Sequence, residues 1–166
     1  LLQSYKPQQI GIFGCSAGGL LTAQAVAWFD AHDLPQPGAI GIFCAGAGNF
    51  FVGDAVQIDK VLRTNIGSGQ EIEYFANANW DDPLVAPINH PELLGRFPPS
   101  LIITSTRDLA LSSAVSTHQR LIGAGAESEL HVYEGLQHYF FSDTEVPESR
   151  QVFDVTARFF DARLAR

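Results

Sequence analysis

The 166-residue sequence has no methionine, two cysteines and few basic residues. Its Lys and Arg residues number 10 against 18 Asp and Glu residues, which gives a formal net charge of −8. Because nucleic acids and anionic membrane surfaces are polyanions, this charge argues against both as partners. No stretch approaches the roughly 18 consecutive apolar residues that a membrane span needs. With 46% hydrophobic residues, the chain can bury the core of one globular domain.

The missing methionine includes position 1, since the chain begins Leu1-Leu2-Gln3. This start is neither an initiator methionine nor a secretory signal, so we expect a fragment or a processed product, and the compartment stays open. Cys15 and Cys44 each end an apolar run. We expect buried free thiols, with a disulfide or a metal pair as the alternative, because no Cys/His grouping has zinc-ligand spacing.

Apolar runs and helical patterns alternate along most of the chain. Predicted strands cover 10–14, 39–44, 100–105 and 129–134, and predicted helices cover 20–31, 110–123 and 148–166. Strands that are apolar on both faces and joined by helices are typical of a mostly parallel sheet in an α/β fold. Glycines and aromatic residues interrupt this rhythm at about 46–80, where we expect an insertion over the strand C-terminal edge, with a short helix at 56–63.

A sharp turn after the first predicted strand has the sequence Gly14-Cys15-Ser16-Ala17-Gly18, with the pattern Gly-x-Ser-x-Gly. A nucleophile on a strand-to-helix turn lies in strained backbone, and glycine neighbours let the chain pass. The helix N-terminus favours negative charge, and the Ala17 amide can donate to an oxyanion. We predict Ser16 as nucleophile, with Gly14 and Gly18 forming its elbow. The alternative is a serine that only caps the helix.

A serine nucleophile needs a base, and the base needs an acid to orient it. Asp108 directly follows the predicted strand at 100–105 and its polar continuation, and His138 follows the strand at 129–134. The carboxyl ends of parallel strands meet at one edge of the sheet, where Ser16 also lies. This convergence of residues far apart in the sequence predicts a Ser16–His138–Asp108 triad.

Other histidines and acids fit this arrangement less well. His131 lies inside a predicted strand, His118 inside a helix, His32 at the opposite rim and His90 in a loop. Asp81, Asp82 and Asp143 lie in loops and compete as the acid. Asp82 precedes a proline and is expected to shape a turn, and Asp143 follows the histidine, in the wrong order. Gly46-Ala47-Gly48 begins like a dinucleotide-binding fingerprint, but Phe51 stands where a third glycine is needed.

With these residues placed, the chain resembles the α/β-hydrolase superfamily and, more narrowly, the hormone-sensitive-lipase-like esterases. The resembling motifs are Gly14-Cys15-Ser16-Ala17-Gly18-Gly19, Asp82-Pro83-Leu84-Val85-Ala86-Pro87, Thr104-Ser105-Thr106-Arg107-Asp108-Leu109 and Gly135-Leu136-Gln137-His138. The resemblance implies an α/β-hydrolase fold that hydrolyses carboxylic esters, usually of short acyl chains, through an acyl-enzyme. By that resemblance Ser16 is the nucleophile, Asp108 the acid, His138 the base and Ala17 one oxyanion donor.

The resemblance also implies a small-molecule ester as partner, with no cofactor and no metal. The triad leaves other serine hydrolases open, such as a peptidase, a lactonase or an amidase. A binding protein that keeps the fold without turnover is the alternative from another class.

Three departures from the family qualify this resemblance. The family carries an upstream His-Gly-Gly segment that completes the oxyanion hole, and this sequence has none. The family often has Pro and then a second Asp after the acid, where Leu109-Ala110-Leu111-Ser112 stands here. Because the strands that normally precede the nucleophile are absent too, we expect the C-terminal half of a longer enzyme. The unpaired strand at Ile10–Gly14 then predicts self-association or poor solubility.

Overall fold

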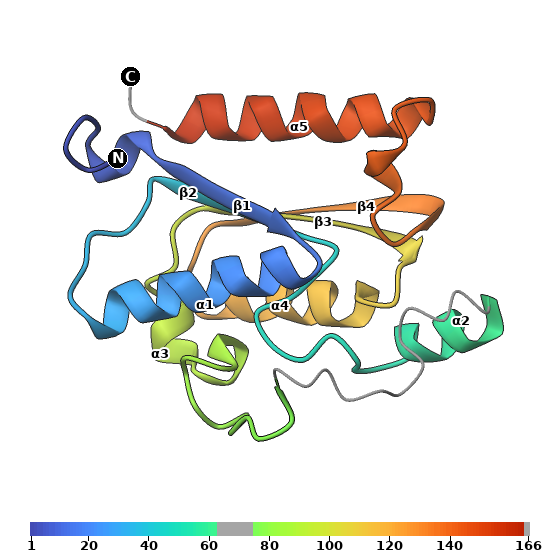
Figure 1. Cartoon of the computed structure of the whole chain (residues 1–166), viewed down its shortest axis with the longest axis horizontal. Helices are drawn as coiled ribbons and strands as arrows, with labels where there is room; N and C mark the ends of the chain where they lie inside the picture. The colour runs from blue at the N-terminus through green and yellow to red at the C-terminus, as the bar shows by residue number, and fades with distance from the viewer. Residues whose placement is uncertain (63–74, 165–166) are drawn as a thin grey trace.

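A computed structural model of the protein describes residues 1–62 and 75–164. The described chain forms a sheet of four parallel strands in the order β1-β2-β3-β4 (Figure 1). The strands are β1 (Gly11–Cys15), β2 (Ala39–Phe43), β3 (Ser100–Arg107) and β4 (Ser128–Gln137). The predicted α/β class is confirmed.

Helices cover both faces of this sheet. They are α1 (Ala17–Ala31), α2 (Ala55–Leu62), α3 (Pro91–Leu94), α4 (Leu111–Gly123) and α5 (Pro147–Arg163). Helices α1 and α4 lie on one face and α5 lies on the other (Figure 1). Among the helices of the described residues, none is long and apolar enough to cross a membrane.

Strand β2 shows how the two faces of the core are built. All five of its residues are buried, and the four with side chains alternate between two apolar clusters. Ile40 and Ile42 pack under α1 and α4, whereas Ala39 and Phe43 pack under α5. Burying each isoleucine side chain fully contributes about 1.5–3 kcal/mol. A strand that is covered on both faces has to be apolar throughout, which is the pattern that its sequence shows.

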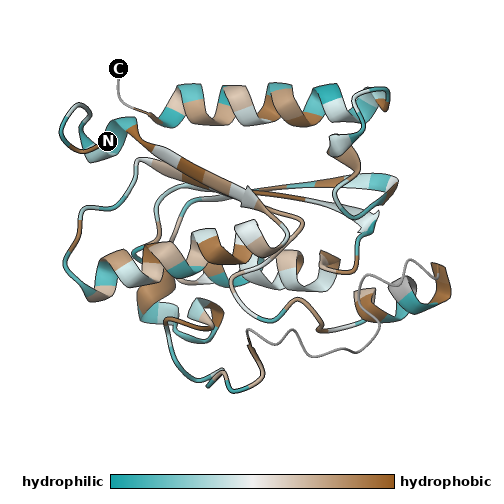
Figure 2. Cartoon of the chain, viewed as in Figure 1, coloured by the Kyte–Doolittle hydropathy of each residue, from teal (hydrophilic) through white to brown (hydrophobic). Residues whose placement is uncertain are grey.

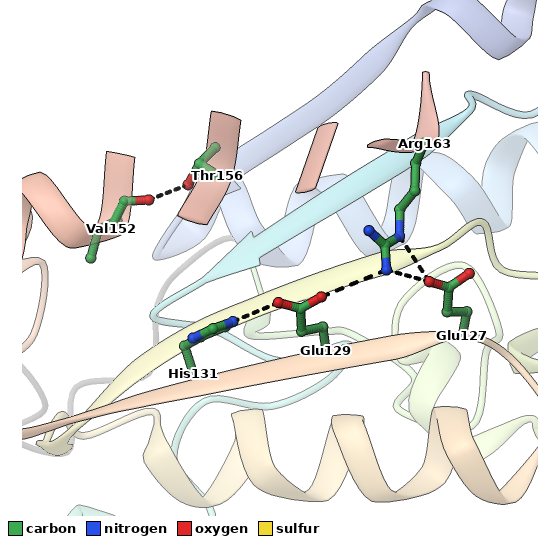
Figure 3. A network of polar contacts seen from close by, with 6 residues as sticks. All are labelled: Glu127, Glu129, His131, Val152, Thr156 and Arg163. Carbon is green, nitrogen blue, oxygen red and sulfur yellow. Dashed lines mark hydrogen bonds and ion pairs between the residues drawn. The ribbon is translucent and has the colours of Figure 1, made fainter. Parts of the chain in front are cut away.

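Hydrophobic and hydrophilic residues alternate along helix α5 in Figure 2. Its buried residues Val152, Val155 and Phe159 recur at helical spacing. Polar contacts add to this packing at the C-terminal end, where Arg163 pairs with Glu127 and lies 3.6 Å from Glu129 (Figure 3). Because these groups are partly exposed, such ion pairs contribute little, and the apolar face holds α5 in place.

Strands β3 and β4 are longer than the sequence pattern predicted. β3 ends at Arg107 and β4 ends at Gln137, because the ladder continues through an irregularity between Ser105 and Arg107. Gly135 adopts a φ of 74°, which glycine tolerates without strain, and its N–H donates to Thr106 Oγ1 at 2.7 Å. As a result His138 is the first residue after β4.

The connection between β2 and β3 holds the segment that we predicted to be an insertion. Helix α2 (Ala55–Leu62) covers the predicted helix at 56–63 except for its last residue. Residues 63–74 lie outside the described part of the chain. The ribbon places α2 toward the end of the sheet where the strands end (Figure 1). Close packing accounts for Gly46, one of the glycines that resemble a nucleotide-binding motif, because an added Cβ would lie 2.3 Å from Ser113 Oγ. One domain over 1–166 with an insertion at about 46–80 stays a prediction.

Strand β1 lies at the edge of the sheet. Among the described strands it pairs with β2 alone, and its burial alternates from exposed to half-buried. Phe13 keeps 61% of its surface exposed, although its ring lies 5.6 Å from that of Phe43. The edge is therefore apolar and open, as the sequence pattern suggested for Ile10–Gly14.

Candidate active site

Ser16 lies on a tight turn between β1 and α1. Its φ of 57° and ψ of −121° fall outside the regions that non-glycine residues ordinarily adopt. The turn is held from both sides: the Ser16 N–H donates to the Phe43 carbonyl at 2.9 Å, and the Ser16 carbonyl accepts from the Gly19 N–H at 3.0 Å. Backbone strain of this kind persists only where the surroundings determine it, and it is typical of functional sites.

His138 lies between Ser16 and Asp108. Its Nε2 is 2.9 Å from Ser16 Oγ, and its Nδ1 is 2.7 Å from Asp108 Oδ1. The three residues follow the ends of β1, β4 and β3, so the parallel sheet brings them together at one rim. Because an ionised Asp108 accepts a hydrogen bond from Nδ1–H, Nε2 carries no proton and can accept the hydrogen bond of the Ser16 hydroxyl. This arrangement can deprotonate a serine during nucleophilic attack.

Asp108 is completely buried, and its charge is held by hydrogen bonds. Burial acts to raise the pKa of Asp108, but the hydrogen bond and charge of His138 and the contacts from Ala110 and Thr104 outweigh it. The pKa therefore lies below its ordinary value of 3.8. Thr104 Oγ1 donates to Oδ2 at 2.8 Å, and the Ala110 N–H donates to Oδ1 at 2.9 Å. These contacts keep the carboxylate ionised in a site closed to water.

Thr104 lies in one of the motifs quoted above, but the sequence did not predict a role for its side chain. It belongs to the apolar run of β3, and only its contact with Asp108, four residues on, reveals its role. The signal was a polar residue in an otherwise buried strand, since buried hydroxyls need a partner. The end of β4 is held similarly, because Ser105 Oγ donates to the Gln137 carbonyl at 3.2 Å. Residues of β3 therefore position both Asp108 and the segment that leads to His138.

The glycines of the turn divide into two kinds. A Cβ on Gly14 would lie 2.3 Å from the Gly18 carbonyl oxygen, so crowding explains this glycine as expected. The same explanation is wrong for Gly18, where an added Cβ would meet nothing within 4 Å. Gly19 is the second crowded position, with Ala45 Cβ at 2.6 Å, because α1 begins close against the end of β2.

The competing acids and histidines have other partners. Asp82 Oδ1 accepts from the Leu84 N–H at 2.8 Å, and Asp143 Oδ1 accepts from the Glu145 N–H at 3.0 Å, so both shape turns. Each of the competing histidines has a hydrogen-bond partner outside the triad. The pairs are His131 with Glu129, His118 with Ser128, His32 with the Trp28 carbonyl and His90 with the Asp81 carbonyl.

Both cysteines are free thiols, as predicted, but only Cys44 is buried and Cys15 is half-buried. Cys15 is less covered than expected because β1 is an edge strand. Cys44, Asp108 and His138 offer ligand atoms within 4.8 Å of one another, which is a donor set that a metal ion accepts. The Nδ1 of His138 and the Oδ1 of Asp108 already hydrogen-bond to each other, so a metal ion would have to displace that contact.

Comparisons with known proteins agree with this fold. A family model described as alpha/beta hydrolase fold matches residues 2–142. The solved structure of an esterase E25 is 33% identical with a TM-score of 0.84 and covers 99% of this chain, which covers 52% of that one. An esterase/lipase from an uncultured bacterium is 22% identical with a TM-score of 0.82, at coverages of 99% and 56%. An esterase from the bacterial hormone-sensitive lipase (HSL) family is 21% identical with a TM-score of 0.83, at the same coverages.

The chain therefore belongs to the α/β-hydrolase family, whose fold it shares. Within that family it is similar to hormone-sensitive-lipase-like esterases, as the sequence motifs indicated. It spans about half the length of the solved structures that it matches, with 52% and 56% of their chains covered. No curated protein matches it.

Proposed function

We propose that this chain carries the catalytic triad of a serine carboxylesterase, with Ser16 as nucleophile, His138 as base and Asp108 as acid. The observation that carries the proposal is the continuous path of contacts from Ser16 Oγ through the imidazole to Asp108, at 2.9 and 2.7 Å. Likeness to esterases supports an ester as the substrate. Short acyl chains are the substrates that we propose, because the motifs resemble those of hormone-sensitive-lipase-like esterases.

In the proposed mechanism Ser16 Oγ attacks the ester carbonyl while His138 Nε2 takes its proton. Ionised Asp108 holds the imidazole tautomer and stabilises the cation that forms. The amide of Ala17, at the first position of α1, has no acceptor within the helix and donates to the developing oxyanion. The alcohol then leaves with the proton from His138, and water hydrolyses the acyl-enzyme by the same steps.

One missing oxyanion donor costs about 10²–10³ in rate. The sequence lacks the family's His-Gly-Gly segment, so we expect slow turnover of esters by this 166-residue chain. Formation of a stable adduct is therefore a better first measurement than turnover, because a slow reaction still goes to completion.

The experiment is labelling of the protein with a fluorophosphonate, read by intact mass. We expect one adduct in the wild type and none in Ser16→Ala or His138→Ala. Ser128→Ala is the matched control, because Ser128 Oγ also lies 2.9 Å from a histidine nitrogen, that of His118, away from the strand-end rim. It should label as the wild type does.

Labelling that persists in Ser16→Ala would reject Ser16 as the nucleophile. A folded wild type that takes no label would favour a non-catalytic scaffold. If Ser16 is labelled, a panel of esters, amides, lactones and peptides separates the esterase from other serine hydrolases. Preference for amides or peptides over short acyl esters would contradict the substrate that we propose.

A further inference from the structure

Strained backbone gathers at the rim of the sheet. Among the described residues, four that are not glycine have positive φ, and three of them lie just beyond strand ends: Ser16 at 57°, Cys44 at 48° and Tyr139 at 58°. Residues with side chains rarely adopt this conformation, and such strain is typical of functional sites. The proposed mechanism explains Ser16 but does not use Cys44 or Tyr139.

The conformation of Cys44 determines where its thiol points. Side chains alternate between the faces of a strand, so Cys44 should point toward α1 and α4, opposite to its neighbour Phe43. It packs instead in the apolar cluster under α5, together with Phe43, and Cys15 packs against that cluster. The left-handed turn at Cys44 therefore brings its thiol to the face that holds Cys15.

The two cysteines lie within bonding range of each other. Cys15 is the register partner of Phe43, the residue before Cys44. The spacing of neighbouring strands and the rise of one residue put their Cα atoms about 6 Å apart. A disulfide usually needs about 4.4–6.8 Å between Cα atoms. The Cys44 Sγ accepts the Tyr139 N–H at 3.3 Å, and interaction with the Cys15 side chain raises the pKa of the Cys44 thiol.

Cys15 can be reached from outside. It lines a groove of about 580 Å³ between the β1 edge and α5, whose other walls include Phe13, Tyr139 and Phe153. Cys44 is fully buried behind it. The hydrogen bond with Cys15, burial and the charge of Asp108 raise the pKa of Cys44 well above its ordinary value of 9.0, so this thiol stays protonated. A reagent that enters the groove therefore meets Cys15 first.

We propose that Cys15 and Cys44 form a reversible dithiol site beside Ser16, which low-molecular-weight disulfides oxidise through Cys15. The Cys15 thiolate attacks one sulfur of the reagent, forms a mixed disulfide and releases one small thiol. Cys44 then attacks the Cys15 sulfur as its proton passes to the departing sulfur of the reagent, which forms the Cys15–Cys44 bond and releases the second small thiol. Two protein thiols are oxidised and one small disulfide is reduced.

The new bond would act on both ends of the proposed triad, a consequence that rests on the proposed function. Cys15 precedes Ser16 in the chain, and the Ser16 N–H donates to the carbonyl of Phe43, which is the residue before Cys44. Cys44 also holds the amide of Tyr139, the neighbour of His138. A displacement of 1 Å at a reacting group can cost about 10²-fold, so we expect labelling of the oxidised protein to be slower by about that factor.

The test is incubation of the native 166-residue protein with oxidised glutathione, an acid quench and intact mass. The expected product of the wild type is lighter by two hydrogen atoms, carries no glutathione and reverts with a phosphine reductant. Cys44→Ser, which cannot resolve the mixed disulfide, should retain one glutathione on Cys15. Cys15→Ser should stay unmodified, because Cys44 is buried.

A wild type that retains glutathione, or that does not react, would overturn the dithiol site, and so would glutathione on Cys44 in Cys15→Ser. Fluorophosphonate labelling of the reduced and oxidised forms then tests the consequence for Ser16. If the reduced protein takes no label, the proposed function fails, whereas the disulfide is still established or rejected by its mass. Equal labelling of both forms would show that the disulfide does not act on Ser16.

Discussion

Strands β1 and β3 hold opposite ends of the proposed triad, and they are packed very differently. β3 pairs with β2 on one side and β4 on the other, and its first six residues are buried. β1 lies at the edge and has no fully buried residue. Asp108 accordingly has no exposed surface, whereas Ser16 is half-buried.

This difference shows two ways of holding a functional side chain in place. Around Asp108 a buried hydroxyl and an amide hold the carboxylate, so its geometry depends on polar contacts within the core. Around Ser16 the turn depends on close backbone packing, since Gly14 lies against Gly18 and the Ser16 N–H reaches β2. Substitutions near the two residues should therefore fail for different reasons.

The largest effect is expected at the Ser16 end, from Gly14→Ala. Its Cβ would lie 2.3 Å from a backbone oxygen that cannot move without the turn, so we expect a loss of about 3 kcal/mol in the free energy of unfolding. Labelling of Ser16 should also be lost. Urea unfolding and fluorophosphonate labelling measure both effects.

Gly18→Ala is the matched control, because an added Cβ there meets nothing within 4 Å. It should retain the stability and the labelling of the wild type. Equal losses in both variants would show that crowding at Gly14 is not what shapes the turn.

An intermediate effect is expected at the Asp108 end, from Thr104→Val. The substitution removes the hydroxyl that donates to Oδ2 at 2.8 Å and leaves a buried carboxylate with one partner fewer, at a cost of about 2 kcal/mol. Thr104→Ser keeps the hydroxyl and should restore most of the loss. If Thr104→Ser were as unstable as Thr104→Val, lost packing of the methyl group would be the cause instead.

The pH dependence of the same variant sharpens this prediction. Folding lowers the pKa of Asp108, so its ionised form stabilises the folded protein at pH values above the ordinary pKa of 3.8. This contribution is lost as the pH falls through the lower pKa of the folded state. Thr104→Val raises the folded pKa toward the unfolded value, so less stability depends on the ionised carboxylate, and the decline on acidification should be smaller and end at a higher pH. Unfolding curves at pH 7, 5 and 3 measure it, and parallel declines in both proteins would contradict the role of the hydroxyl.

The smallest effect on the fold is expected from Phe13→Lys at the β1 edge. A charge on an exposed strand opposes pairing with another chain, so self-association in sedimentation velocity should decrease. Phe153→Lys is the control, because Phe153 is similarly exposed but lies on α5. A wild type that sediments as a monomer would remove the basis of this prediction, and equal effects of both variants would attribute self-association to the groove rather than to the strand edge.

The sequence by itself determined the fold class and the membership of the candidate site. Buried parallel strands have to be apolar along their length, so the runs at 10–14, 39–44, 100–105 and 129–134 were visible without any structure. Parallel strands end at one edge, and that topology was enough to select Ser16, Asp108 and His138 from a larger set of serines, acids and histidines.

Other features were decided by the tertiary structure alone. β4 continues to Gln137 because of an irregularity that it shares with β3, and no local pattern records such a pairing. Thr104 positions Asp108 because the end of β3 and the turn that follows it bring the threonine hydroxyl within hydrogen-bond distance of the carboxylate. Cys44 faces Cys15 because its backbone turns at φ 48°, against the alternation that its position in the sequence predicts. Sequence periodicity describes regular elements, whereas these contacts arise where the elements end and the backbone departs from regularity.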